Sequence, residues 1–291
     1  MSNDKNNEKL QNLLLLGSDL TGSAASEVAG FANGSVVGGP AGAAVGGVAG
    51  LGISKLIKLA KDTAKKQLSS REETRVGAAI IFSIEKIQHK LNSGEKIRDD
   101  GFFQFNNENS RSDAEEIFEG VLLKSKNTHE ENKLKFIASL FANIAFQNNM
   151  SLGEANQLLT SVEKLTYRQI RCLSLFNTAS MPNSFQLREE SYNDEDEIQT
   201  QMPLETISLL QEIFELERLG LVTCLLAPSN MSEDWQEDCI TTGNYLALIR
   251  WNNIVPKRLK LTALGKRYYQ LMDLHEVPKM ELEILAKILS K

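Results

Sequence analysis

Apolar positions in residues 69–178 recur with the spacing of amphipathic helices. They fall three and four residues apart, which places them on one face of a helix. Two such stripes are Val76, Ala79, Ile80, Ile84 and Ile87, and then Leu134, Ile137, Ala138, Phe141 and Ile144. The pattern predicts an all-helical domain of about five helices, interrupted at residues 94–109.

Five S/T-x-x-E/Q patterns mark expected helix starts. In such a capping box, side chain and backbone satisfy each other's unpaired groups at the helix N-terminus. The pairs are Ser70/Glu73, Ser112/Glu115, Thr128/Glu131, Ser151/Glu154 and Thr166/Gln169. Each pair predicts the N-terminus of a helix.

From Thr166 onward, strands are expected among the helices. The expected elements are helices over 166–177 and 204–219, strands over 220–226 and 258–262, and a helix that Thr262 caps and that runs through Met272. An acidic loop over 189–197 separates the first two helices. The predicted fold class is mostly α, with a helical N-terminal and middle part followed by an α+β C-terminal domain.

Two stretches of this domain resemble the winged-helix superfamily. Leu216-Glu217-Arg218-Leu219-Gly220-Leu221-Val222 is similar to the passage from the recognition helix into the wing, and Leu261-Thr262-Ala263-Leu264-Gly265 is similar to the step after the wing. The resemblance covers about 120 residues. It implies a winged-helix fold, and such domains usually bind DNA through the helix before the wing.

The charge of this region disfavours DNA as the partner. Residues 162–291 hold 14 basic and 19 acidic side chains, a net charge of 14 − 19 = −5. The expected recognition helix would present Glu205, Glu212, Glu215 and Glu217 against Arg218 alone. Because phosphate contacts dominate DNA affinity, we prefer protein contact or dimerisation for this domain.

A short basic strand is the best argument for nucleic acid. Lys257, Arg258 and Lys260, followed by Lys266 and Arg267, form a small positive group on an acidic domain. The first three are also candidate contacts for a protein partner. DNA binding therefore stays open as the alternative.

Residues 28–54 form an unusual stretch of 27 residues without a formal charge, here called the glycine-register segment. Of the chain's 19 glycines, 11 fall between Gly17 and Gly52. Six of them recur at every fourth position, namely Gly30, Gly34, Gly38, Gly42, Gly46 and Gly50. On a helix this spacing leaves a groove without side chains, by which helices approach each other closely in lipid. Pro40 is an expected kink or hairpin point.

This segment is poorly suited to exist alone in either water or lipid. As a helix, the span from Gly30 to Gly50 would cover about 30 Å, the thickness of a bilayer hydrocarbon core. Its few apolar side chains barely favour insertion, and its nine glycines cost about 7 to 9 kcal/mol of helix propensity in water relative to alanine. Three interpretations stay open: conditional membrane insertion with oligomerisation, tight packing inside a soluble protein, and a flexible linker. We prefer the first.

A basic amphipathic stretch follows directly. Its apolar positions include Ile53, Leu56 and Ala60, and it holds a single acid, Asp62. Its lysines are Lys55, Lys58, Lys61, Lys65 and Lys66. This composition suits anionic lipid head groups, whereas the alternative is the solvated face of a surface helix.

The interruption at residues 94–109 holds a third candidate contact. Phe102 and Phe103 look exposed and follow Arg98 closely, so these three residues are candidate contacts for a partner. The alternative, which we prefer, is an aromatic anchor that fastens the loop to the helices beside a local Arg/Asp pair.

Sequence motifs give no indication of catalysis. The phosphate-binding loop, CxxC, HExxH and GxSxG patterns are absent from the sequence, and His89, His129 and His275 stand alone. The carboxylates Glu115, Glu116, Glu119, Glu130 and Glu131 lack the Glu-x-x-His pairing of a di-metal bundle, so we interpret them as a charged helix surface. We expect no enzyme, no cofactor and no metal site.

Composition and the N-terminus indicate the compartment. The net charge of −6 removes the global positive field of a nucleic-acid binder. Three cysteines without a close pair indicate a reducing compartment. The apolar run over residues 13–16 is too short for an export signal, so we expect a cytoplasmic protein that associates conditionally with the inner face of the membrane.

Together these patterns predict four regions: a polar, flexible region over 1–27, the glycine-register segment and basic helix over 28–68, a helical domain over 69–165, and a winged-helix-like domain over 166–291. The favoured function is a non-enzymatic effector that oligomerises in a membrane and permeabilises it, with a protein partner or sensor as the trigger. A toxin-like or phage-defence setting is an analogy. The alternative is a winged-helix regulator or adaptor that binds DNA or a protein.

Overall fold

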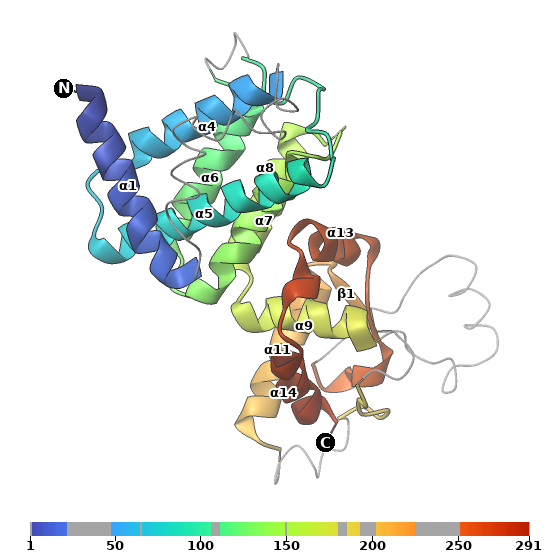
Figure 1. Ribbon diagram of the computed structural model, residues 1–291. Helices are drawn as coiled ribbons and strands as arrows, with labels where there is room; N and C mark the ends of the chain where they lie inside the picture. Colours follow the sequence, from blue (N-terminus) through green and yellow to red (C-terminus); the bar gives the residue numbers. More distant parts are fainter. Residues whose placement is uncertain are drawn as a thin grey trace. The chain divides into compact units, whose positions relative to one another are not determined.

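The computed structural model divides the chain into two compact units, Met1–Leu165 and Thr166–Lys291 (Figure 1). The structure describes residues 2–21, 48–64, 66–105, 111–148, 150–179, 185–192, 202–224 and 251–290. These residues are mostly helical, with one small antiparallel sheet in the second unit, so the predicted fold class is confirmed. The division falls where the sequence places the start of the C-terminal domain.

The first unit is built from helices around a central one, α5. Its elements are α1 (Ser2–Thr21), α4 (Val48–Ala64), α5 (Ser70–Asn92), α6 (Asp113–Asn127), the short 3-10 helix η1 (Glu131–Lys133), α7 (Leu134–Ile144) and α8 (Leu152–Lys164). Helix α5 packs against α1, α6 and α7, and α4 lies against α1 and α6. The apolar stripes predicted for α5 and α7 are buried throughout.

Helix α7 is buried in this core and is apolar on nearly every side. All of its residues except Lys135 are buried. The Phe118 and Phe141 rings, from α6 and α7, lie 4.9 Å apart between centroids, which is ordinary aromatic packing distance. Lys133, just before α7, is buried, and its Nζ donates to the carbonyl oxygen of Glu163 at 3.0 Å. Burial lowers the pKa of Lys133.

The helix starts agree with three of the five predicted capping boxes. At Ser112 the Oγ accepts from the Glu115 N–H, while the Ser112 N–H donates to the Glu115 carboxylate. The Thr166/Gln169 pair makes the same reciprocal contacts, and Ser151 caps α8 by accepting from the Glu154 N–H.

Two predicted caps were wrong. Helix α5 is capped by Ser69 with Glu72, one residue earlier than Ser70 and Glu73. The Glu72 carboxylate accepts from the Ser69 N–H at 2.8 Å, and this hydrogen bond lowers the pKa of Glu72. Thr128 ends α6 instead of starting a helix, and Glu131 accepts from Arg71 and Arg75 of α5.

The polar, flexible region predicted for residues 1–27 was also wrong over residues 2–21. These residues form α1, which packs along α5. Leu10, Leu13 and Leu14 are buried, so a short apolar stripe in an otherwise polar sequence is sufficient to dock the helix. Residues 22–27 lie outside the described residues.

The second unit combines helices with one strand pair. Its elements are α9 (Tyr167–Ala179), α11 (Leu204–Arg218), β1 (Val222–Cys224), the 3-10 helices η3 (Trp251–Asn253) and η4 (Pro256–Arg258), β2 (Leu259–Leu261), α13 (Ala263–Leu271), η5 (Leu274–Glu276) and α14 (Lys279–Leu289). Strands β1 and β2 pair antiparallel, with Val222 opposite Leu261 and Cys224 opposite Leu259. Both predicted strands and the helices at 166–177, 204–219 and 262–272 are therefore present.

A close backbone contact joins the end of α11 to the start of α13. The Thr262 Oγ1 donates to the Gly220 carbonyl oxygen at 2.5 Å and accepts from the Gly265 N–H at 3.0 Å. A Cβ atom on Gly265 would lie 1.9 Å from the Leu221 carbonyl oxygen, so only glycine fits there. Gly220 has a φ of 70°, which also favours glycine. These are the residues that carry the winged-helix resemblance.

Candidate membrane-contact site

Helix α4 is amphipathic in the sense that the sequence predicts. Leu56 and Ala60 are 5% and 1% exposed and face the rest of the first unit. Lys58 is exposed, and Lys55 and Lys61 are half-buried. Lys66, just after the helix, is exposed, whereas Lys65 lies outside the described residues.

The glycine register falls almost entirely outside the described residues. This holds for Gly30, Gly34, Gly38, Gly42 and Gly46, while Gly50 belongs to the first turn of α4. The segment follows α1 and leads into α4, which pack against each other. Within the part of the chain that the structure describes, no helix is both long and apolar enough to cross a membrane. Insertion of the glycine-register segment stays a prediction.

A glycine pair that sequence reasoning missed fixes α1 on α5. A Cβ atom on Gly77 would lie 2.0 Å from the Leu13 carbonyl oxygen, and one on Gly17 would lie 2.3 Å from the Gly77 carbonyl carbon. The two helix backbones therefore touch where neither residue has a side chain. Gly17 lies outside the glycine register, which begins at Gly30. The sequence could have indicated Gly17 only if the packing of α1 against α5 had been known.

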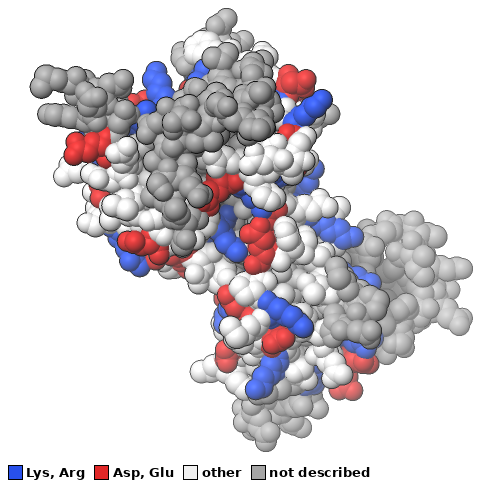
Figure 2. All heavy atoms as spheres, in the orientation of Figure 1, with Lys and Arg blue, Asp and Glu red and all other residues white. Residues whose placement is uncertain are grey.

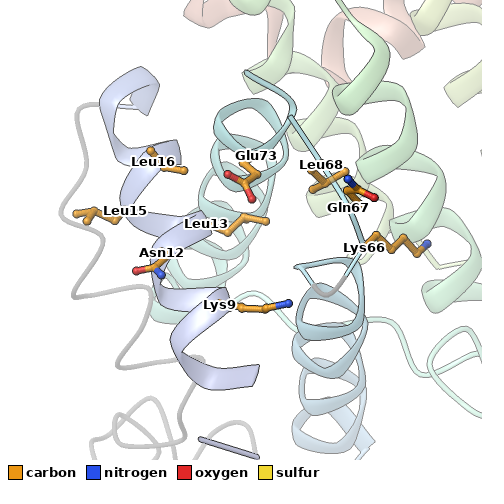
Figure 3. A pocket seen from close by; sticks show the side chains of 9 residues that line it. All are labelled: Lys9, Asn12, Leu13, Leu15, Leu16, Lys66, Gln67, Leu68 and Glu73. Carbon is orange, nitrogen blue, oxygen red and sulfur yellow. The ribbon is translucent and has the colours of Figure 1, made fainter. Parts of the chain in front are cut away.

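A pocket of about 640 Å³ opens beside this helix contact (Figure 3). Its wall comes from α1, the chain just after α4, and the first turn of α5. The lining residues are Lys9, Asn12, Leu13, Leu15, Leu16, Lys66, Gln67, Leu68 and Glu73. Figure 3 shows the Lys9 side chain and the Glu73 carboxylate pointing into the gap, while Leu15 points away from it. The lining mixes both charges with leucines and thus defines no ligand class.

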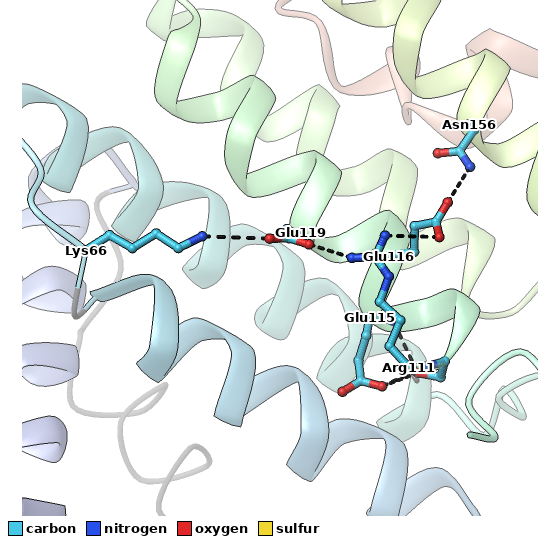
Figure 4. A network of polar contacts seen from close by, with 7 residues as sticks. Lys66, Arg111, Glu115, Glu116, Glu119 and Asn156 are labelled. Atoms are coloured by element: carbon cyan, nitrogen blue, oxygen red, sulfur yellow. Dashed lines mark hydrogen bonds and ion pairs between the residues drawn. The ribbon is translucent and has the colours of Figure 1, made fainter. Parts of the chain in front are cut away.

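The glutamates of α6 take part in a polar network instead of facing one another (Figure 4). Arg111 pairs with Glu116 at 3.1 Å and with Glu119 at 2.6 Å, and Glu119 also lies 3.7 Å from Lys66. Glu116 accepts from the Asn156 amide at 2.9 Å. These contacts fit the interpretation as a charged helix surface. Among the residues that the structure describes, no three potential metal ligands gather.

The loop residues Arg98, Phe102 and Phe103 are buried, at 5%, 3% and 3% exposure. The exposure expected from the sequence was therefore wrong, and the structure has the preferred anchor arrangement. The Arg98 guanidinium donates to both Asp100 carboxylate oxygens and to the Met150 carbonyl oxygen, and it lies 4.4 Å from the Phe102 ring centroid. These residues fasten the loop and have little surface left for a partner.

The second unit places its basic strand at the surface. Lys260 is exposed on β2, Arg258 is half-buried, and Lys257 forms an ion pair with Glu189. Figure 2 shows acidic and basic side chains interspersed over the visible face. Among the described residues on that face, no extended positive surface is visible.

One acid of the expected recognition helix is not presented as the sequence suggested. Glu212 on α11 accepts two hydrogen bonds from Arg168 of α9, at 3.0 and 2.7 Å, and one from the Thr166 hydroxyl at 3.2 Å. Arg168 thus neutralises Glu212 within the unit. The repulsion from α11 is weaker than the sequence count indicates.

Comparison with known proteins adds no relative to these observations. No protein-family model, no curated protein and no solved structure matches the chain.

Proposed function

We propose that the chain is a non-enzymatic effector that perturbs a membrane. In this proposal the glycine-register segment leaves the first unit after an activating signal, enters the bilayer and joins other copies through its glycine groove. Close packing of several copies supplies the contacts that a single glycine-rich helix lacks in water and in lipid.

The observation that carries the proposal is the orientation of α4. This helix begins within the last part of the segment and continues past it. It holds Lys58 at the surface, with Lys55 and Lys61 half-buried and Asp62 as its single acid. Each lysine near an anionic bilayer contributes about 1 kcal/mol of attraction. Because α1 and α4 flank the segment and belong to one unit, that unit can hold it in a resting form.

The experiment is release of a trapped dye from vesicles that contain anionic lipid. The wild-type chain is expected to release dye, and the double variant Gly42→Leu/Gly46→Leu is expected to lose most of that release because leucines fill the groove. Gly39→Leu/Gly47→Leu is the matched control: it adds the same side chains to the same segment outside the register. Equal loss in both double variants, or intact vesicles with the wild-type chain under every activating condition, would contradict the proposal.

A second candidate function rests on the second unit. The strand pair, the exposed Lys260 and the neutralised Glu212 support a winged-helix regulator or adaptor that binds DNA or a protein. A gel-shift assay across salt concentrations separates the two functions, because duplex binding through phosphates weakens steeply with salt. Salt-sensitive binding that Lys260→Glu abolishes would favour this second function.

A further inference from the structure

We infer that Phe105, together with Lys55 and Lys58, is a docking patch for the surface of an anionic bilayer and that it acts while the first unit is still folded. The inference rests on the proposed function, since it names the place where that membrane contact begins. The inference goes beyond the proposed function in two ways. It adds an aromatic residue from the loop before α6, and it adds a binding step that needs no activating signal.

Phe105 stands out by its exposure. Its side chain is 56% exposed, and it is the one aromatic among the exposed large apolar side chains of the described residues. Phe102 and Phe103, three and two positions earlier, are buried as the anchor of the same loop. The ring of Phe105 is therefore exposed to solvent just after the part of the loop that is anchored to the helices.

The exposed ring lies beside a cation of α4. The Lys55 Nζ is 5.6 Å from the centroid of the Phe105 ring. This distance is within the range of a cation–π contact, which keeps the ring and the ammonium group together at the surface. Lys58 follows one turn later on the same helix and is exposed. Asp62, the acid of α4, comes in the last turn of the helix, two turns after Lys55 and one turn after Lys58.

The packing of α4 explains why a second source of apolar surface is needed. An amphipathic helix usually binds a bilayer through its own apolar face. In α4 that face is already used, because Leu56 and Ala60 are buried against the rest of the unit. Phe105 can supply the apolar contact without any unfolding, while the lysines supply the attraction.

Charge and position favour an anionic bilayer over a protein as the occupant. Lys55 lies beside the ring, and Lys58 is exposed one turn further along α4. An aromatic residue beside lysines is the combination that binds at the level of lipid head groups. The two lysines of the patch lie on α4, which begins within the last part of the glycine-register segment. Docking through this patch would bring the glycine-register segment close to the bilayer that it is proposed to enter.

The test is flotation of the full-length chain with vesicles, without any activating treatment. Vesicles of phosphatidylglycerol and phosphatidylcholine are compared with vesicles of phosphatidylcholine alone. The wild-type chain is expected to float with the anionic vesicles only, and Phe105→Ala and Lys55→Glu are expected to weaken binding about tenfold each. Leu123→Ala is the matched control, because Leu123 is a similarly exposed apolar residue, 46%, on α6 of the same unit.

The outcomes separate this inference from the proposed function when dye release is measured on the same samples. Unchanged flotation of Phe105→Ala, or equal loss in Leu123→Ala, overturns the inference even if the wild-type chain releases dye. Flotation that depends on Phe105, together with intact vesicles under every activating condition, supports the inference and contradicts the proposed function. If the wild-type chain floats with neither kind of vesicle, the inference is overturned, and a protein partner becomes the alternative occupant of the patch. Circular dichroism of each variant verifies that it is folded.

Discussion

Tyr167 is a residue whose protonation the fold controls. Burial, reinforced by the neighbouring Glu281 carboxylate, raises the pKa of Tyr167 to about 12 from its ordinary value near 10. The folded state therefore retains a proton that the unfolded state loses. The resulting stabilisation is complete below about pH 10 and is lost as the pH rises through about 12.

Ultraviolet absorbance of tyrosinate measures this shift directly. Of the chain's five tyrosines, one is expected to ionise near pH 12 in the folded protein, and Tyr167→Phe should remove that step. Survival of the late step in the variant would assign it to another tyrosine.

The close packing of α1 against α5 depends on Gly77. A methyl group at this position would meet the backbone of α1, 2.0 Å from the Leu13 carbonyl oxygen, so Gly77→Ala should destabilise the first unit. Overpacking of this kind costs about 1–3 kcal/mol, measurable by urea unfolding. Gly153→Ala in α8 is the control, because its Cβ atom would meet only the Ser151 Oγ, at 4.0 Å. A Gly77→Ala chain as stable as this control would refute the close contact.

At the residue scale, the sequence located some functional candidates better than others. Lys58 of α4 is exposed, and Lys55 and Lys61 are half-buried, because charged groups avoid complete burial; the sequence pattern contained that information. Phe102 looked exposed because a loop residue carries no periodicity, and only the tertiary fold buries it. Gly17 and Gly77 could not be paired in advance, since no local pattern states which helices will touch.

Helix α5 offers a test at the element scale. Ser69 is its N-cap and shares a capping box with Glu72, while Ser70 is already inside the helix. Ser69→Ala should therefore cost about 1 kcal/mol of unfolding free energy, and Ser70→Ala much less. Urea unfolding of the two single variants distinguishes them, and a larger loss for Ser70→Ala would restore the capping frame read from the sequence.

Periodicity explains which elements were predictable. The stripes of α5 and α7 repeat over several turns, and turn residues such as Gly220 bound the strands, so these elements were found. The start predicted for α7 at Thr128 was nevertheless wrong, because Thr128 ends α6 and α7 begins at Leu134. The shift from Ser70 to Ser69 arose because serines occupy both positions and glutamates occupy both 72 and 73. Helix α1 was missed because its apolar stripe is short and its stability depends on α5.

On the scale of the whole molecule, the features that support the two candidate functions lie in different units. The first unit holds both flanks of the glycine-register segment and the proposed docking patch, while the second holds the strand pair and a basic strand at its surface. In the proposed function, the first unit is the one that acts on the membrane. Composition and hydropathy alone left this segment between water and lipid, because its apolar side chains barely favour insertion while its glycines disfavour a lone helix in water.

The most direct measurement is the environment of a fluorophore in the middle of the segment. An environment-sensitive dye is attached at Val37→Cys in a chain carrying Cys239→Ser. Cys172 and Cys224 are buried, and burial raises the pKa of Cys172 to about 12, so both remain unlabelled in the folded protein. Asn92→Cys, exposed at the end of α5, is the control site. Anionic vesicles with brominated lipid tails are added to the labelled chain, either otherwise unchanged or carrying Gly77→Leu. The leucine side chain is expected to displace α1 from α5.

The account predicts a blue shift and quenching by the lipid tails at Val37→Cys, strongest in the Gly77→Leu background, with no change at Asn92→Cys. A dye at Val37→Cys that remains as unquenched as the one at Asn92→Cys in both backgrounds would contradict it.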